Sequence, residues 1–150
     1  MKDQRRGRKI AMTPAEVDAF LTEERTCRLA TMGANGPHAT PLWFVWNGTA
    51  LWLSSLVKSQ RWTDIERDPR VAVVVDAGHD FRELRGVELR GRLESVGEVP
   101  RVGTPDPDLD ALERLHALKY TGREEKHYDG RHAWLRLTPE KITSWDFRKM

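Results

Sequence analysis

The stretch that decides the fold is residues 26–55, TCRLATMGANGPHATPLWFVWNGTALWLSS. It contains three runs rich in apolar and β-branched residues, separated by turn residues. Strands are therefore predicted at residues 26–32, 38–46 and 49–55. Asn47-Gly48 is the strongest hairpin signal in the chain, because both residues accept the positive φ of a type I′ turn. We expect these strands to form an antiparallel meander.

The second of these strands contains a proline. Pro41 cannot donate a backbone hydrogen bond, so we expect its strand to lie at a sheet edge. Further strands are predicted downstream, at residues 70–76, 84–96, 132–137 and 142–147. The run Val71-Ala72-Val73-Val74-Val75 has no polar alternation, which indicates burial on both faces of its strand.

Capping residues and apolar spacing indicate the helices. Thr13 and Glu16 can form a capping box, which predicts that a helix begins there. A short helix is expected at residues 59–67, because Asp68-Pro69 ends it. A third helix ends at Gly122. Its expected apolar stripe consists of Leu109, Leu112, Leu115 and Leu118.

Together these patterns predict one mainly β domain of the α+β type. It is expected to be an antiparallel barrel of about six strands with two to three flanking helices. We place this domain at residues 12–150. Residues 1–11 carry a cluster of basic side chains and are expected to form a mobile tail.

Composition and charge narrow the classes of function. The chain has 25 basic and 23 acidic residues and a formal net charge of +2, which argues against nucleic acid as a partner. No apolar stretch approaches the about 20 residues needed to span a bilayer, and no signal core follows the basic start. We therefore expect a cytoplasmic protein without a membrane partner. The single cysteine, Cys27, excludes an internal disulfide and is expected to be a buried structural thiol.

Motifs for nucleotide-loop, hydrolytic and metal-centred chemistry are absent. There is no Gly-x-Gly-x-x-Gly, no phosphate loop, no His-Glu-x-x-His and no Gly-x-Ser-x-Gly. None of the five histidines forms a pair with metal-ligand spacing. If the protein is an enzyme, a cofactor is therefore expected to carry the chemistry.

One segment combines hydroxyl and basic side chains at a predicted helix start. It contains Ser54, Ser55, Lys58, Ser59 and Arg61. A helix N-terminus favours a phosphate group, and an arginine there can add a bidentate contact. A capped helix with solvated basic residues explains the segment equally well, so the residues alone leave both interpretations open.

Four stretches resemble the pyridoxamine 5′-phosphate oxidase-like superfamily. They are Arg28-Leu29-Ala30-Thr31, Pro41-Leu42-Trp43-Phe44, Ser54-Ser55 and Arg67-Asp68-Pro69-Arg70-Val71. Within this superfamily the chain is similar to the actinobacterial flavin/deazaflavin oxidoreductases that use coenzyme F-420, in particular their B group. The resemblance runs from Met12 to Phe147.

The resemblance implies a split-barrel homodimer whose cofactor sites are shared between the subunits. Arg61 falls at the family's phosphate-binding position, and the family's hydroxyl contacts fall on Ser54, Ser55 and Ser59. The strand whose backbone faces the flavin ring contains Thr40, Pro41, Leu42 and Phe44. A partner subunit is expected to reach the same site through Trp145 and Arg148.

The resemblance also implies a reaction: transfer of a hydride from reduced coenzyme F-420 to an unsaturated small organic acceptor. An FMN-dependent oxidase or reductase of the same fold is the alternative. A further alternative is a non-catalytic protein that binds a cofactor, haem or tetrapyrrole. Oxidation of pyridoxamine phosphate itself is not expected, because the C-terminus lacks the family's pair of arginine and histidine for the substrate phosphate.

Overall fold

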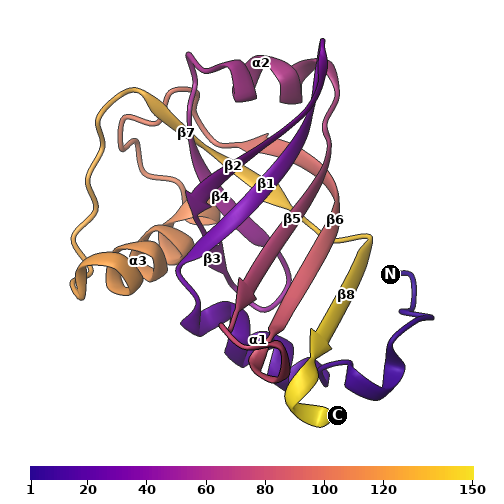
Figure 1. Ribbon diagram of the computed structural model, residues 1–150. Helices are drawn as coiled ribbons and strands as arrows, with labels where there is room; N and C mark the ends of the chain where they lie inside the picture. Colours follow the sequence, from indigo (N-terminus) through magenta and orange to yellow (C-terminus); the bar gives the residue numbers. More distant parts are fainter.

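Antiparallel sheet is the main regular structure of the computed structural model, which describes all residues from Met1 to Met150 (Figure 1). The strands are β1 Thr26–Gly33, β2 Gly36–Trp43, β3 Val45–Trp46, β4 Leu51–Leu56, β5 Arg70–Ala77, β6 Arg85–Val96, β7 His132–Leu137 and β8 Lys141–Asp146. The α-helices are α1 Pro14–Glu23, α2 Gln60–Arg67 and α3 Pro107–Thr121. Short 3-10 turns are η1 Arg8–Ile10, η2 Phe81–Glu83 and η3 Phe147–Lys149. None of the three α-helices has the length and apolar character needed to cross a membrane.

The sheet curls because one long strand belongs to both of its halves. The strand order is β2-β1-β5-β6-β7-β4-β3, and β8 pairs with β6 outside this path. Residues 85–92 of β6 pair with β5, whereas residues 93–96 pair with β7. This arrangement confirms the predicted mainly β, antiparallel split barrel. Eight strands are present where about six were predicted, partly because the second predicted strand is divided in two.

The division lies at Phe44, between β2 and β3. The Tyr120 hydroxyl of α3 donates to the Phe44 carbonyl oxygen at 2.7 Å and accepts from the Phe44 amide at 2.9 Å. These backbone groups therefore bind a side chain, and the ladder is interrupted. As a result β2 and β3 lie at opposite ends of the strand order although they are neighbours in the sequence.

The predicted edge position of Pro41 is confirmed, because β2 pairs with β1 alone. Both antiparallel pairings of the predicted meander are present, β1 with β2 and β3 with β4, but the break between β2 and β3 places the two hairpins at opposite ends of the strand order. The predicted type I′ turn is wrong, although a hairpin is present at Asn47-Gly48. Gly48 has a positive φ of 95° but Asn47 does not. The Asn47 side chain instead accepts hydrogen bonds from the amides of Thr49 and Ala50, at 3.0 and 2.9 Å, which stabilises a longer loop.

Strand β5 is buried on one face, not on both as predicted. Val71, Val73 and Val75 pack in the barrel core, whereas Ala72 and Val74 are half-buried. Within one chain no helix covers the outer face of β5, which leaves Ala72 and Val74 partly exposed (Figure 1).

The predicted start of α1 at a Thr13–Glu16 capping box is confirmed, and so is the end of α3 at Gly122. The apolar stripe predicted for α3 is only half right. Leu109 and Leu112 are buried, but Leu115 and Leu118 are exposed at 37% and 43%. A spacing of three drifts around a helix with 3.6 residues per turn, so the buried side continues instead through Glu113 and Ala117.

The predicted N-terminal tail runs beside β8. Gln4 donates from its side chain to the Ser144 carbonyl and accepts from the Ser144 amide, both at 3.0 Å. A short bridge also joins Lys2 to Lys141. Whether residues 1–11 are mobile stays a prediction.

Candidate functional site

The loop between β4 and α2 determines where Arg61 lies. Ser59 caps the helix: its hydroxyl accepts from the Trp62 amide at 3.1 Å and donates to the Leu56 carbonyl at 2.8 Å. This bond pair ties the helix start to the end of β4. Arg61 is consequently held in the first turn of α2, next to the barrel.

Arg61 brings together residues from three elements. Its Nε donates to the Ser55 hydroxyl of β4 at 3.3 Å, and its Nη1 donates to the Thr40 hydroxyl of β2 at 3.3 Å. Ser55 is fully buried, whereas Thr40 and Arg61 are half-buried. We call Thr40, Ser55, Ser59 and Arg61 the Arg61 cluster.

The charge of Arg61 has no carboxylate partner. Its contacts are two neutral hydroxyls, while Arg101 is held by the carboxylates of Glu98 and Glu113. Burial lowers the pKa of Arg61, and this shows the cost of desolvating its charge. A half-buried cation without a counterion favours an anion, and a guanidinium suits the geometry of a phosphate. The donor set of the Arg61 cluster therefore fits a phosphate group.

The other residues predicted around the phosphate are placed differently. Ser54 lies on the opposite face of β4 from Ser55, since side chains alternate along a strand, and it lines a separate cavity. Lys58 is exposed in the turn before α2. The structure thus brings three of the predicted residues, Thr40, Ser55 and Ser59, together with Arg61 and leaves Ser54 and Lys58 outside.

The strand predicted to face a flavin ring has one available edge. Pro41 is exposed and Leu42 is half-buried on β2, whose outer edge pairs with no other strand. The side chain of Phe44 is fully buried in the core, and its backbone groups already bind Tyr120. Residues 40–42 can therefore present backbone groups to a ligand, whereas Phe44 cannot.

Trp145 and Arg148 lie far from the Arg61 cluster within one chain. They belong to β8 and η3, next to the C-terminus, while α2 lies at the other end of the barrel (Figure 1). Arg148 makes a two-pronged contact with Asp146, at 2.9 and 2.7 Å. Trp145 covers Gly86, where a Cβ atom would lie 2.4 Å from its ring. A single chain does not bring either residue to Arg61.

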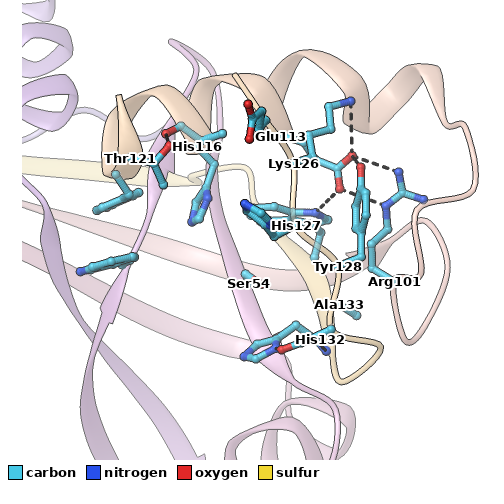
Figure 2. A pocket seen from close by; sticks show the side chains of 16 residues that line it. Ser54, Arg101, Glu113, His116, Thr121, Lys126, His127, Tyr128, His132 and Ala133 are labelled. Carbon is cyan, nitrogen blue, oxygen red and sulfur yellow. Dashed lines mark hydrogen bonds and ion pairs between the residues drawn. The ribbon is translucent and has the colours of Figure 1, made fainter. Parts of the chain in front are cut away.

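A second feature was not predicted from the sequence: a cavity of about 450 Å³ between α3 and the pair β4–β7 (Figure 2). Its lining comes from β2, β4, the loop before α3, α3 itself, the segment after it and β7, so no local motif could reveal it. On one side the rings of Trp43 and Tyr120 stack, with centroids 4.2 Å apart. His116 and Ser54 also line the cavity.

A buried ion pair supports the other side of this cavity. Arg101 contacts both carboxylate oxygens of Glu113 at 3.0 Å, and the Trp134 indole donates to the same carboxylate at 3.0 Å. Burial opposes ionisation of Glu113, but these hydrogen bonds outweigh it and lower its pKa. The ion pair joins the loop before α3 to the helix itself and to β7.

Comparison with known proteins identifies relatives of the whole domain. A family model described as pyridoxamine 5′-phosphate oxidase matches residues 13–146. The structure of the conserved hypothetical protein Rv2991 from Mycobacterium tuberculosis is 32% identical, with a TM-score of 0.79 over 99% of this chain and 92% of that chain. No curated protein matches.

Two further solved structures are of proteins described by a cofactor that they bind or use. A FAD-binding protein from Mesorhizobium loti is 25% identical, with a TM-score of 0.65 over 89% of this chain and 93% of that chain. A structure described as an F420 reductase is 23% identical and shares the fold, with a TM-score of 0.62 over 83% and 94% of the two chains. The family model spans almost the entire barrel, and the resemblance seen in the sequence is confirmed: the chain belongs to the pyridoxamine 5′-phosphate oxidase family.

Proposed function

We propose that this protein is an oxidoreductase that binds coenzyme F-420 and reduces an unsaturated small organic acceptor. The observation that carries the proposal is Arg61, a half-buried cation with two hydroxyl neighbours and no carboxylate partner. Membership of the family supports a phosphorylated flavin-type cofactor, and one structure of the same fold is described as an F420 reductase.

In this proposal the chain's own residues bind the cofactor phosphate and orient the cofactor ring. Arg61 neutralises the cofactor phosphate, the Thr40 hydroxyl is a donor beside it, and the buried Ser55 hydroxyl holds the guanidinium in place. The free edge of β2 at residues 40–42 orients the ring system through backbone groups. When bound, the reduced deazaflavin supplies the hydride. No side chain of the Arg61 cluster is a general acid at neutral pH, so solvent provides the proton.

FMN is the second candidate cofactor. The phosphate contact at Arg61 would be the same, and the Mesorhizobium loti relative is described as FAD-binding. The two candidates are separated by titrating the purified protein with each cofactor. If the protein binds FMN with micromolar affinity and does not bind coenzyme F-420, the cofactor is FMN.

The phosphate assignment is tested by Arg61→Ala. We expect cofactor binding to weaken by about 1.5–3 kcal/mol, because a charge-assisted contact is lost. This corresponds to a dissociation constant raised about 10- to 150-fold in calorimetric titration. Arg82→Ala removes an exposed arginine in η2 and serves as the matched control, which should bind the cofactor as the unchanged protein does. If Arg61→Ala leaves the dissociation constant of the cofactor unaltered, Arg61 does not bind the cofactor phosphate.

We also propose that the protein is a homodimer and that each cofactor site is completed by the partner. The support is the placement of Trp145 and Arg148, which one chain cannot bring to its own Arg61. In this arrangement the outer face of β5, where Ala72 and Val74 are half-buried, is available for burial against a second copy.

A further inference from the structure

The cavity between α3 and the pair β4–β7 is separated from the Arg61 cluster by a single strand. Ser54 and Ser55 are consecutive residues of β4, so their side chains leave the strand on opposite faces. Ser55 reaches Arg61, whereas Ser54 lines the cavity (Figure 2). A ligand in the cavity would therefore contact none of the groups that hold the proposed cofactor phosphate.

Aromatic rings form a continuous wall along this cavity. The ring of Tyr120 stacks on Trp43 at an interplanar angle of 9°. His116 follows, with its centroid 4.9 Å from Tyr120 and 5.3 Å from Trp134. Trp43 is 54% exposed, so it forms the rim and not the floor. Such walls favour flat aromatic partners, which can stack on the rings or meet them edge to face.

Polar groups without a partner line the same space. The side chains of Ser54, His116 and His127 make no hydrogen bond within the protein, and Figure 2 shows these residues around the same opening. Burial lowers the pKa of His116, so its imidazole is neutral at pH 7 and offers one donor and one acceptor. No group of three or more metal-ligating side chains is assembled here. These groups therefore suit a ligand that has its own hydrogen-bonding atoms.

The arginine and lysine charges of the cavity are already paired, in contrast to the charge of Arg61. Arg101 is held by Glu113, and Lys126 donates to Asp110. No cation is left free for an anionic ligand, and Glu125 on the lining adds a negative charge. The volume of about 450 Å³ lies within the range of small-molecule sites, which is about 300–1,000 Å³.

From these four observations we infer that the cavity is a second ligand site, specific for an uncharged, planar heteroaromatic molecule of one or two rings. The aromatic wall stacks against the ring. Ser54 and His116 bind its ring heteroatom. The site functions whether or not the Arg61 cluster binds a phosphate, because the two share no side chain.

Quinoline, which is neutral at pH 7, is a suitable probe in isothermal titration calorimetry. We expect saturable binding with a dissociation constant below about 1 mM. Quinoline-2-carboxylate has the same rings and a negative charge, and we expect it to bind about tenfold more weakly or worse. Arg61→Ala should not change the affinity for quinoline, which separates this site from the cofactor proposal.

Two variants locate the binding. Thr121→Trp puts a large ring at the exposed edge of the cavity and is expected to weaken quinoline binding at least about tenfold. Leu118→Trp is the matched control, since Leu118 is exposed on the same helix and does not line the cavity. Ser54→Ala removes one polar contact without adding bulk and should weaken binding severalfold, which keeps the test valid if Thr121→Trp misfolds.

The inference is overturned by any of three results. The first is the absence of saturable quinoline binding to the unchanged protein. The second is binding that neither Thr121→Trp nor Ser54→Ala weakens. The third is tighter binding of the carboxylate than of quinoline itself.

Discussion

Arg61 and Lys119 are both half-buried cations without a carboxylate partner, but only Lys119 is satisfied within the protein. The Lys119 ammonium lies 3.9 Å from the centroid of the Phe44 ring and donates to the Leu21 carbonyl at 3.3 Å. Burial still lowers its pKa to about 8. Arg61 has two neutral hydroxyl contacts and no carbonyl or aromatic ring. Arg61, unlike Lys119, therefore lacks a carbonyl or ring partner within the protein and is positioned to bind an external anion.

Tyr120 is the residue on which the interruption between β2 and β3 depends. In Tyr120→Phe the Phe44 amide and carbonyl lose their shared partner while the ring stays in place. We expect the free energy of unfolding, measured in urea, to fall by about 1–3 kcal/mol, because buried backbone groups are left unpaired. Hydrogen exchange at the Phe44 amide should become faster. Tyr128→Phe is the control, since Tyr128 also donates one hydroxyl hydrogen bond but lies away from Phe44. Equal protection of the Phe44 amide in both variants would contradict this role.

At the residue scale, the sequence predicts local contacts and misses those that depend on strand pairing or distant partners. The Ser59 cap and the position of Arg61 follow from residues within one turn of each other. Ser54 and Ser55 are predicted together at one phosphate site, although neighbouring residues of a strand point to opposite faces. The bond from Tyr120 to Phe44 joins residues 76 positions apart, and no local pattern reports it.

The loop that joins β6 to α3 is organised by one carboxylate. Glu98 accepts from the amides of Val102, Gly103 and Thr104 at 2.8, 2.9 and 3.0 Å, and from Arg101 at 2.7 Å. The hydrogen bond from the Val102 amide is the foremost cause that lowers the pKa of Glu98 to about 2. The loop is therefore built around an ionised side chain, although its sequence looks like an ordinary proline-rich connection.

A pH dependence follows from this carboxylate. Its pKa is lower in the folded state than the ordinary value of 4.5, so its contribution to stability is fully present above pH 4.5. That contribution is lost as the pH falls from 4.5 to about 2, because the folded state must then take up the proton. In Glu98→Gln we expect lower stability at pH 7 and a flatter loss of stability over this window in thermal unfolding.

Glu94→Gln is the control, since Glu94 is exposed on β6 and pairs only with Arg136. An unfolding profile of Glu98→Gln that keeps the slope of the unchanged protein between pH 4.5 and 2 would show that the loop does not depend on the charge.

At the element scale, the existence and type of the helices and strands were largely predictable, because capping residues and alternation are local signals. The exceptions have physical causes that act beyond one element. The Asn47-Gly48 loop is set by an asparagine side chain that binds two amides, and not by two residues of positive φ. Leu115 and Leu118, in the second half of the α3 stripe, are exposed because leucines three residues apart do not match the helical period of 3.6 residues.

At the scale of the whole molecule, the barrel is held together by β6, which pairs with β5 and β8 in one half and with β7 in the other. Antiparallel barrel architecture was predictable from the number and spacing of strands. The pairing of β4 with β7 was not, because the two are separated by about half of the chain. The same long-range closure creates the cavity under α3, and this explains why sequence motifs did not reveal it.

The proposed homodimer makes a prediction for mixtures of variants. Arg61→Ala and Trp145→Ala should each bind the cofactor weakly when prepared alone. If each site combines Arg61 of one subunit with Trp145 of the other, a mixed dimer contains one site with both residues intact. We therefore expect cofactor binding of near-normal affinity to return when the two variants are unfolded together and refolded.

Sedimentation of the unmixed proteins provides the control, since both variants must still be dimers for the comparison to hold. A mixture that binds no better than its components would exclude Trp145 of the partner subunit from the cofactor site. If the unchanged protein sediments as a monomer, a cofactor site shared between two subunits is excluded.

The alternation of Ser54 and Ser55 on β4 has a consequence for how this chain can diverge in evolution. A substitution at either position alters one site and spares the other. An insertion or deletion of a single residue within β4 would shift the strand by one position, and the side chains of both sites would exchange faces together. Lineages that retain either ligand are therefore expected to vary β4 in composition but to conserve its length, and gaps in family members should fall in the flanking loops.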